Sequence, residues 1–230
     1  MSDKRTKISY AIKVLTAVCS ILGVTLSLIL YAEDGYSHWA KRLMYFTTMS
    51  NVWVGLLFLF MVILPFTKLN DNIKVKRVTL IIKYSFTIAI TITGFIFLCV
   101  LAPFAHKSGY NAWSTSSILT HILTPVLTII DFFLGEMIEL KIKHLFLALI
   151  PLFFYLIFAS VLCVLKVDFG RGEPFPYFFF NYYSPAGLFG FSPTTPPFVL
   201  GSVYWIILIL LITLSIGLAY VKLYPKNKKK

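Results

Sequence analysis

One apolar segment of the chain carries an unusual concentration of polar side chains. Between residues 115 and 135 these are Ser117, Thr120, His121, Thr124, Thr128 and Asp131. At 3.6 residues per turn, all six fall within an arc of about 100° on one face of a helix. Polar groups inside a membrane helix face the protein interior, where they find partners or do chemistry. We therefore expect this stripe to face the other helices and not lipid.

A second polar group opens the apolar segment 44–66. Thr47, Ser50 and Asn51 share one helix face, at i, i+3 and i+4. If this segment and the segment 115–135 run in the same direction, Thr47 lies roughly 5 Å and His121 roughly 9 Å below the starts of their helices. The two side chains are therefore expected at a similar depth.

A threonine hydroxyl beside a histidine suggests nucleophilic catalysis. The hydroxyl attacks effectively only when a base removes its proton, and a neutral imidazole is well matched to that task near pH 7. We hypothesise that Thr47 attacks an ester carbonyl and that His121 takes and returns the proton. The oxyanion would be stabilised by one of three nearby polar side chains: Ser50, Asn51 or Ser117.

Each of these residues also has a structural interpretation. A membrane threonine most often returns its hydroxyl to a carbonyl of the preceding turn. Asp131 lies roughly 15 Å along the helix from His121, where it would be solvated or paired with Lys141 or Lys143. We predict no metal site and no cofactor, because His121 has no His, Asp or Glu at i+3 or i+4 and the other histidines are scattered.

The composition explains why polar residues are so informative in this chain. Of its 230 residues, 58% are hydrophobic and 13% are charged, whereas a soluble domain carries roughly 25% charged residues. We therefore predict an all-α integral membrane protein, a six-transmembrane helix bundle that forms a single domain over residues 1–230. At about 20 apolar residues per crossing, the expected spans are 8–31, 44–66, 78–104, 115–135, 144–166 and 199–222.

Lysine and arginine are distributed unevenly between the two ends of these spans. Thirteen fall in the amino tail, the 67–77 and 136–143 loops and the carboxyl tail, whereas the opposite side carries four. The positive-inside rule then predicts a multi-pass protein of the cell membrane with both termini in the cytoplasm. The net charge of +12 mostly reflects this topology. No basic patch with interleaved aromatic residues lies elsewhere, so we expect no nucleic-acid partner.

Residues 167–198 form the longest predicted connection, on the outer side. They contain many aromatic residues, six prolines and four glycines. A segment this apolar is expected in the membrane interface, either as an aromatic anchoring belt or as a cap folded over the mouth of the bundle. Asp168, Arg171 and Glu173 are the charges near the outer face that are available to orient a histidine.

Three stretches resemble the androgen-induced family of membrane threonine hydrolases. They are Tyr45-Phe46-Thr47, His121 followed ten residues later by Asp131, and Phe175-Pro176-Tyr177 just after the fifth span. Two longer runs, Phe46-Thr47-Thr48-Met49-Ser50-Asn51 and His121 through Asp131-Phe132-Phe133-Leu134, look like the bacterial six-transmembrane branch of that family.

The resemblance implies a threonine nucleophile and a histidine base that act on lipid esters, in animal members the fatty acid esters of hydroxy fatty acids. By position, the nucleophile falls on Thr47 and the base on His121. Thr48 follows directly and is the alternative nucleophile. The acidic residue is Asp131 where animal members tend to have Glu. Membrane lipids or lipid esters are the implied partners.

The sequence is also compatible with two other functional classes. The polar stripe of residues 115–135 would also suit a small-solute transporter or channel, and Asp131 extends such a path inward. A non-catalytic membrane scaffold is the third class. The sequence determines neither the substrate nor the oligomeric state.

Overall fold

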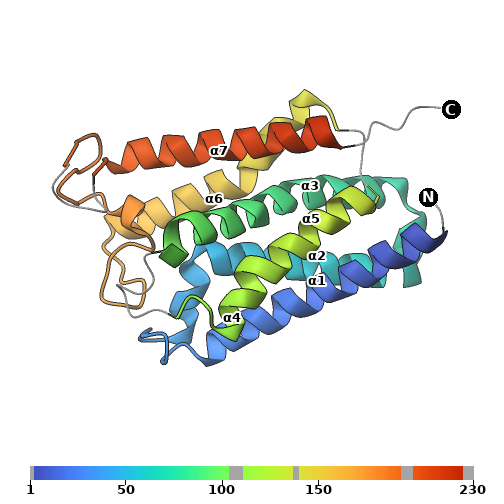
Figure 1. Cartoon of the computed structure of the whole chain (residues 1–230), viewed down its shortest axis with the longest axis horizontal. Coiled ribbons are helices and arrows are strands. Elements are labelled where there is room, and N and C mark those ends of the chain that lie inside the picture. Colours follow the sequence, from blue (N-terminus) through green and yellow to red (C-terminus); the bar gives the residue numbers. More distant parts are fainter. Residues whose placement is uncertain (1–2, 104–110, 137–139, 193–198, 225–230) are drawn as a thin grey trace.

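A computed structural model describes residues 3–103, 111–136, 140–192 and 199–224. Six of its helices are long and apolar enough to cross a membrane, which confirms the predicted all-α six-helix bundle (Figure 1). These spans are Lys4–Ile29, Phe46–Phe66, Ile73–Leu101, Thr115–Leu134, Ile142–Val164 and Ser202–Leu223. Predictions for residue 104, for loop residues 193–198 and for the tail from residue 225 lie outside the described residues.

The spans are built from seven α-helices and short irregular turns. The α-helices are α1 (Asp3–Ile29), α2 (Phe46–Ile63), α3 (Ile73–Ile96), α4 (Thr115–Ile118), α5 (Thr124–Leu134), α6 (Leu145–Val164) and α7 (Ser202–Leu223). Two π-helical turns, η4 (Phe97–Leu101) and η6 (Leu119–Leu123), extend α3 and join α4 to α5. The fourth span is therefore α4, η6 and α5 in succession.

The third helix begins earlier than the predicted residue 78. Asn72 caps α3, because its side-chain oxygen accepts from the backbone N–H groups of Lys74 and Val75. Lys74, Lys76 and Arg77 consequently lie within the helix and not in the preceding loop. Basic side chains with long aliphatic stems are good helix formers, so a charged first turn does not delay the start of the helix.

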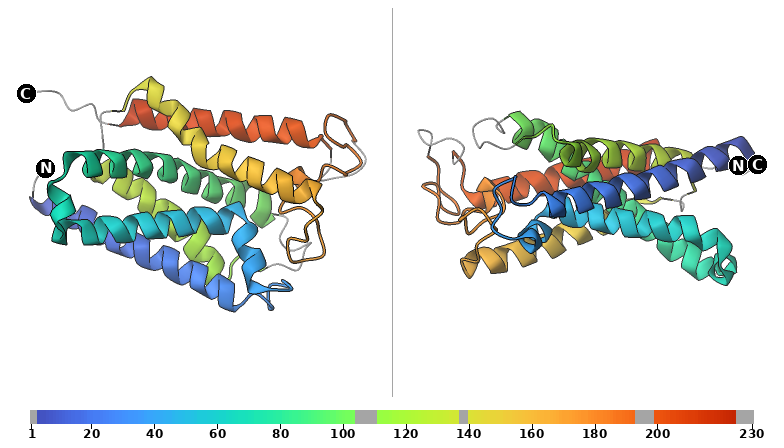
Figure 2. Two further views of the ribbon diagram at one scale, coloured as in Figure 1. Left: turned by 180° about the vertical axis from the view of Figure 1, so that it is seen from behind. Right: turned by 90° about the horizontal axis from the view of Figure 1, so that it is seen from below.

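Helix α3 occupies the centre of the bundle. It packs against α2, α5 and α6, while α1 packs against α2 and α5, and α6 packs against α7. Figures 1 and 2 show the chain termini at one end of the bundle and the connection between α6 and α7 at the other. We call these the terminal end and the loop end.

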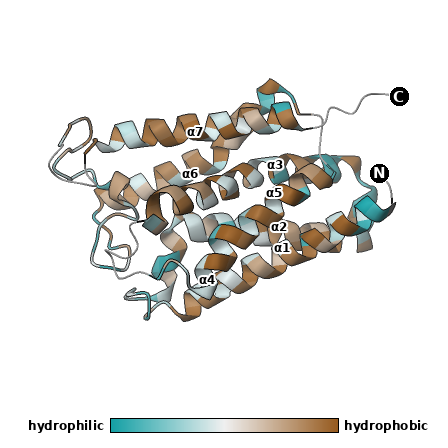
Figure 3. Cartoon of the chain, in the orientation of Figure 1, coloured by the Kyte–Doolittle hydropathy of each residue, from teal (hydrophilic) through white to brown (hydrophobic). Residues whose placement is uncertain are grey.

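The hydropathy of the residues changes along the long axis of the bundle. In Figure 3, apolar residues cover most of the helix lengths, and hydrophilic residues gather mainly near the two ends. Large apolar side chains such as Leu56, Phe154 and Ile157 are more than half exposed on the helix surfaces. Such faces suit contact with lipid, and they leave the polar residues of the stripe directed inward.

Candidate functional site

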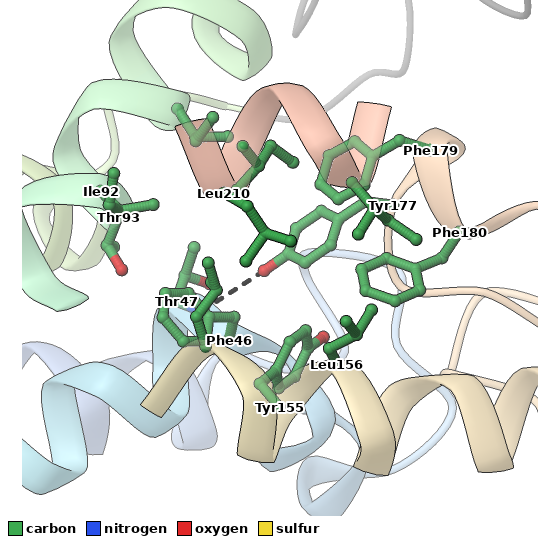
Figure 4. Close-up of a pocket in the computed structure, with 14 residues that line it drawn as sticks. Phe46, Thr47, Ile92, Thr93, Tyr155, Leu156, Tyr177, Phe179, Phe180 and Leu210 are labelled. Atoms are coloured by element: carbon green, nitrogen blue, oxygen red, sulfur yellow. Dashed lines mark hydrogen bonds between the residues drawn. The ribbon is translucent and has the colours of Figure 1, made fainter. Parts of the chain in front are cut away.

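A mostly apolar cavity, which we call the apolar pocket, lies at the loop end between α2, α3, α6 and α7 (Figure 4). The space between its walls, counted together with its open mouth, is about 560 Å³. Its lining residues are Phe46, Thr47, Ile92, Thr93, Ile96, Leu152, Tyr155, Leu156, Tyr177, Phe179, Phe180, Ile206, Ile209 and Leu210. Only four of these side chains carry a hydroxyl group, and one of them is Thr47.

The first part of the aromatic connection folds over the pocket as a cap and forms part of its wall. Phe179 and Phe180, in the short helix η8 (Phe178–Phe180), are buried against it. Of the stretch that carries the family resemblance, Pro176 is buried and Phe175 packs against the same core. The later part of the connection differs, because Phe189 and Phe191 are about two-thirds exposed. One segment thus supplies both the expected cap and exposed aromatic rings.

Tyr177 brings its hydroxyl to the start of α2. Its phenol oxygen accepts a hydrogen bond from the backbone N–H of Thr47 at 3.3 Å, and Figure 4 shows the ring directed at this turn. The first N–H groups of a helix have no partner within the helix, so the phenol satisfies one of them. Burial raises the pKa of Tyr177 above its usual value. The phenol therefore keeps its proton and can donate it to a bound ligand.

The hydroxyl of Thr47 is placed differently from those of most other membrane threonines in the bundle. Thr87, Thr93 and Thr128, for example, donate to the carbonyl four residues earlier in their helices. Thr47 is the second residue of α2, so no preceding turn of that helix is available to it. It lies at the pocket wall and is partly exposed, whereas the alternative nucleophile Thr48 is buried and does not line the pocket.

Ser50 and Asn51, the two polar neighbours of Thr47 on its helix face, already make hydrogen bonds to other residues. Ser50 shares a hydrogen bond of 2.7 Å with Thr93. Asn51 uses its amide nitrogen twice, donating to the carbonyl of Thr47 at 2.7 Å and to that of Thr120 at 3.1 Å. Ser50 and Asn51 are therefore less well placed to donate to an oxyanion than the phenol of Tyr177 is.

Pro125 explains why Asn51 reaches across to the fourth span. At the end of the π-helical turn η6, the N–H of Thr124 bonds to the carbonyl of Leu119, five residues earlier. Pro125 has no N–H, so the carbonyl of Thr120 loses its partner in the helix. Asn51 replaces that partner. Pro125 also lies close to Gly94 of α3, where an added Cβ would come within 3.2 Å of the proline ring.

His121 lies in this π-helical turn, with its ring stacked on Phe97 at a centroid distance of 4.1 Å. Its Nδ1 is 3.1 Å from the carbonyl of Ser117 and 2.9 Å from the hydroxyl of Thr120. A carbonyl only accepts, so this network assigns the proton to Nδ1 and leaves a lone pair on Nε2. His121 is not among the residues that line the pocket, and no hydrogen bond joins it to Thr47.

The rest of the predicted stripe is buried as expected. Ser117, Thr120, Thr124, Thr128 and Asp131 are each at most 6% exposed. Asp131 belongs to this buried stripe and does not follow its structural interpretation as a solvated side chain or one paired with Lys141 or Lys143. It is 0% exposed and contacts Lys83 at 2.6 Å and Lys13 at 2.9 Å. Sequence patterns missed this arrangement, because the two lysines come from helices α3 and α1.

The charges near the loop end form their own network. Asp168 lies 3.8 Å from Lys41 and accepts from the backbone N–H groups of Gly170 and Gly172. The guanidinium of Arg171 lies over the ring of Tyr36. None of these described contacts reaches His121. Arg42, which sequence reasoning did not single out, is also buried here, paired with Asp34 and stacked on Tyr36.

The described residues include no group of three His, Cys, Asp or Glu side chains close enough to hold a metal ion. No family model, curated protein or solved structure matches this chain. The resemblance to the threonine hydrolases therefore stays a prediction, and the geometry of the site is what bears on function.

Proposed function

We propose that this protein is an intramembrane hydrolase of lipid esters, with Thr47 as the nucleophile. The observation that carries the proposal is the position of Thr47, whose hydroxyl lies on the wall of an apolar pocket and makes no bond to a preceding turn. An acyl chain would occupy the pocket between α2, α3, α6 and α7. Its ester group would lie at the start of α2, beside the phenol of Tyr177.

In the proposed reaction, the Thr47 oxygen attacks the ester carbonyl carbon and its proton passes to Nε2 of His121. The Tyr177 phenol donates to the carbonyl oxygen as negative charge develops there. The C–O bond to the alcohol then breaks, and the alcohol leaves with the proton from His121. Water repeats the same steps on the acyl-threonine, which releases the fatty acid and restores the hydroxyl.

The bridge through Asn51 supports the choice of His121 as the base. Because Asn51 bonds both to Thr47 and to Thr120, the turn that holds the nucleophile lies beside the turn that holds the histidine. Proton transfer requires the two side chains to approach within hydrogen-bond distance when substrate is bound. The π-helical turn provides a local departure from α-helical geometry at this position, as is frequent at functional sites.

A fluorophosphonate probe tests the nucleophile directly in the detergent-solubilised protein. Wild type should become covalently labelled, and Thr47→Ala should reduce labelling to background. Thr48→Ala is the matched control and should label like wild type. Unlabelled wild type, or equal labelling of Thr47→Ala, would contradict the proposal.

The pocket has a separate test with two substitutions on one helix. Ile209→Trp fills the pocket, whereas Ile207 is 48% exposed and does not line it. We expect Ile209→Trp to block labelling by a long-chain probe and to spare labelling by a short one. Ile207→Trp should accept both probes. If the two variants behave alike, the acyl chain does not occupy this pocket.

We also propose that the loop end faces outward in a cell membrane, with both termini in the cytoplasm. The excess of lysine and arginine at the terminal end supports this orientation. Single cysteines introduced at Lys74 and Gly172, in a protein whose three native cysteines are replaced, should react with an impermeant maleimide from opposite sides. Reaction of the Lys74 site from outside would reverse the orientation.

A further inference from the structure

The connection between α2 and α3 stands apart from the rest of the terminal end. It contains the short helices η2 (Leu64–Phe66) and η3 (Lys68–Asp71) and leads into α3 at Ile73. These short helices pack chiefly against each other and against α2 and α3. In the right-hand view of Figure 2, the connection lies away from the start of α1. We call residues 64–78 the basic turn.

Four basic side chains of the basic turn are exposed: Lys68, Lys74, Lys76 and Arg77. Asp71 is the one acidic residue of this segment, so its net charge is +3. In the described part of the chain, no ion pair or hydrogen bond engages the side chains of these four cations. They are therefore available to a partner outside the chain.

Several other basic residues of the bundle are bound within the protein. Arg5 donates to two backbone carbonyls at the end of α5. Lys13 and Lys83 both contact the carboxylate of Asp131. The cations of the basic turn differ from these, because the fold gives them no anionic or carbonyl partner among the described residues.

The position of these cations in α3 is electrostatically unfavourable. Lys74, Lys76 and Arg77 lie within the first five residues of the helix, and its first turn has no acidic residue. A helix start carries partial positive charge, which repels cations. An external anion beside the three side chains would offset this repulsion. The Asn72 side chain already binds the N–H groups of Lys74 and Val75, so the anion would be held by side chains.

Two apolar side chains lie on either side of η3. Phe66 is 80% exposed and Ile73 is 81% exposed, the highest values of any large apolar side chain in the described residues. Phe66 ends the second span and Ile73 begins the third, so both are expected where hydrocarbon meets the head groups. The long stems of lysine and arginine let their charges reach the head groups from this level.

We propose that the basic turn is a binding surface for an anionic phospholipid. Lys74 and Arg77, three residues apart on one helix face, hold the phosphate, and an acyl chain packs against Phe66 and Ile73. An acidic protein or a nucleic acid would neutralise the cations but leave the two apolar side chains uncovered. The inference is independent of the hydrolase proposal, because Thr47 and the apolar pocket lie at the loop end.

Lipid retention by the purified protein tests the inference. The protein is equilibrated in detergent micelles with equal amounts of phosphatidylglycerol and phosphatidylcholine of the same acyl chains. It is then washed on an affinity resin, and the retained lipids are quantified by mass spectrometry. Wild type should retain several-fold more phosphatidylglycerol than phosphatidylcholine. Added salt should reduce this excess, because it screens the attraction between exposed charges.

Two double variants remove equal charge from the terminal end. Lys74→Gln with Arg77→Gln should remove most of the phosphatidylglycerol excess. Lys4→Gln with Lys222→Gln also neutralises two exposed cations, outside the basic turn, and should keep the excess. Equal losses in the two variants would assign the effect to the overall charge of the terminal end and overturn the inference. Equal retention of the two lipids by wild type would overturn it as well.

The apolar contact has a matched pair of its own. Ile73→Ser should lower the retained phosphatidylglycerol several-fold. Ile142 is 70% exposed and lies outside the basic turn, so Ile142→Ser should retain the wild-type amount. If Ile73→Ser retains as much as wild type, the surface binds the charged head group without the acyl chain, and its assignment to a lipid fails.

Discussion

The apolar pocket lies at the loop end, and the contact between Lys13, Asp131 and Lys83, the ion cluster, lies toward the terminal end. The two regions differ in what their polar groups contact. In the pocket, a few hydroxyls face an apolar space, and the hydroxyl of Thr47 is not bonded to its own helix. In the ion cluster, Asp131 is surrounded by three donors from two other helices. A polar group at the pocket wall can meet a ligand, whereas one in the ion cluster is occupied by protein partners.

The difference follows from where each group lies along its helix. Thr47 is at the first turn of α2, where backbone N–H groups lack helical partners and a loop residue, Tyr177, completes the bonding. Asp131 lies within the last turns of α5, against two neighbouring helices. The start of α2 thus offers a backbone N–H that a loop residue can bind, while the charges inside the bundle are paired with other helices.

The largest expected effect comes from one substitution made at two acidic positions. Asp131→Asn leaves the buried Lys83 and the partly buried Lys13 without a carboxylate and should lower the free energy of unfolding by about 3–5 kcal/mol. Asp168→Asn keeps the oxygen that accepts from the loop N–H groups and removes only the partly exposed pair with Lys41. It should cost less than about 1 kcal/mol.

Denaturant unfolding in detergent, followed by circular dichroism, measures both variants. Similar losses at the two positions would show that burial does not distinguish the ion cluster from the loop network. The comparison between the two ends of the bundle would then lose its energetic basis.

An intermediate effect is expected at Asn51, which links the pocket turn to the fourth span. Asn51→Leu leaves the carbonyl of Thr120 without its donor and should lower the free energy of unfolding by about 1–3 kcal/mol. Asn70, in the turn between α2 and α3, is only partly buried. Asn70→Leu is the control and should change stability little. If the control is equally destabilised, the cross-helix bond contributes no more than an ordinary polar surface contact.

The smallest effect is expected at the cap of the pocket. Tyr177→Phe removes only the hydroxyl oxygen, so fluorophosphonate labelling should slow by up to about tenfold, since one neutral hydrogen bond contributes roughly 1 kcal/mol. Because burial raises the pKa of Tyr177, the wild-type phenol keeps its proton at the alkaline pH where an exposed tyrosine ionises, near pH 10. Its contribution to labelling should not decline there.

Tyr183 provides the control for this variant, because it lies in the same connection and is 61% exposed. Tyr183→Phe should label at the wild-type rate. An unchanged rate for Tyr177→Phe would remove the phenol from the proposed mechanism and leave Thr47 in place.

Sequence patterns were informative where the signal is local. The helix period placed Thr124, Thr128 and Asp131 on one face, and these residues are buried. The start of α3 was missed by five residues, because hydropathy decreases at Lys74, Lys76 and Arg77 although the capped helix continues through them. Hydropathy thus reports the membrane core better than it reports helix ends.

The composition and periodicity of this chain were sufficient to identify a six-helix membrane bundle and its inward polar stripe, because lipid excludes polar side chains wherever a helix lies in the bundle. Which side chains bind one another within the bundle was decided only by the tertiary structure. Lys13, Lys83 and Asp131 are distant in sequence, and they meet only because α1, α3 and α5 are neighbours. The folding of Tyr177 back onto α2 likewise depends on the packing of the whole loop end, which no local pattern encodes.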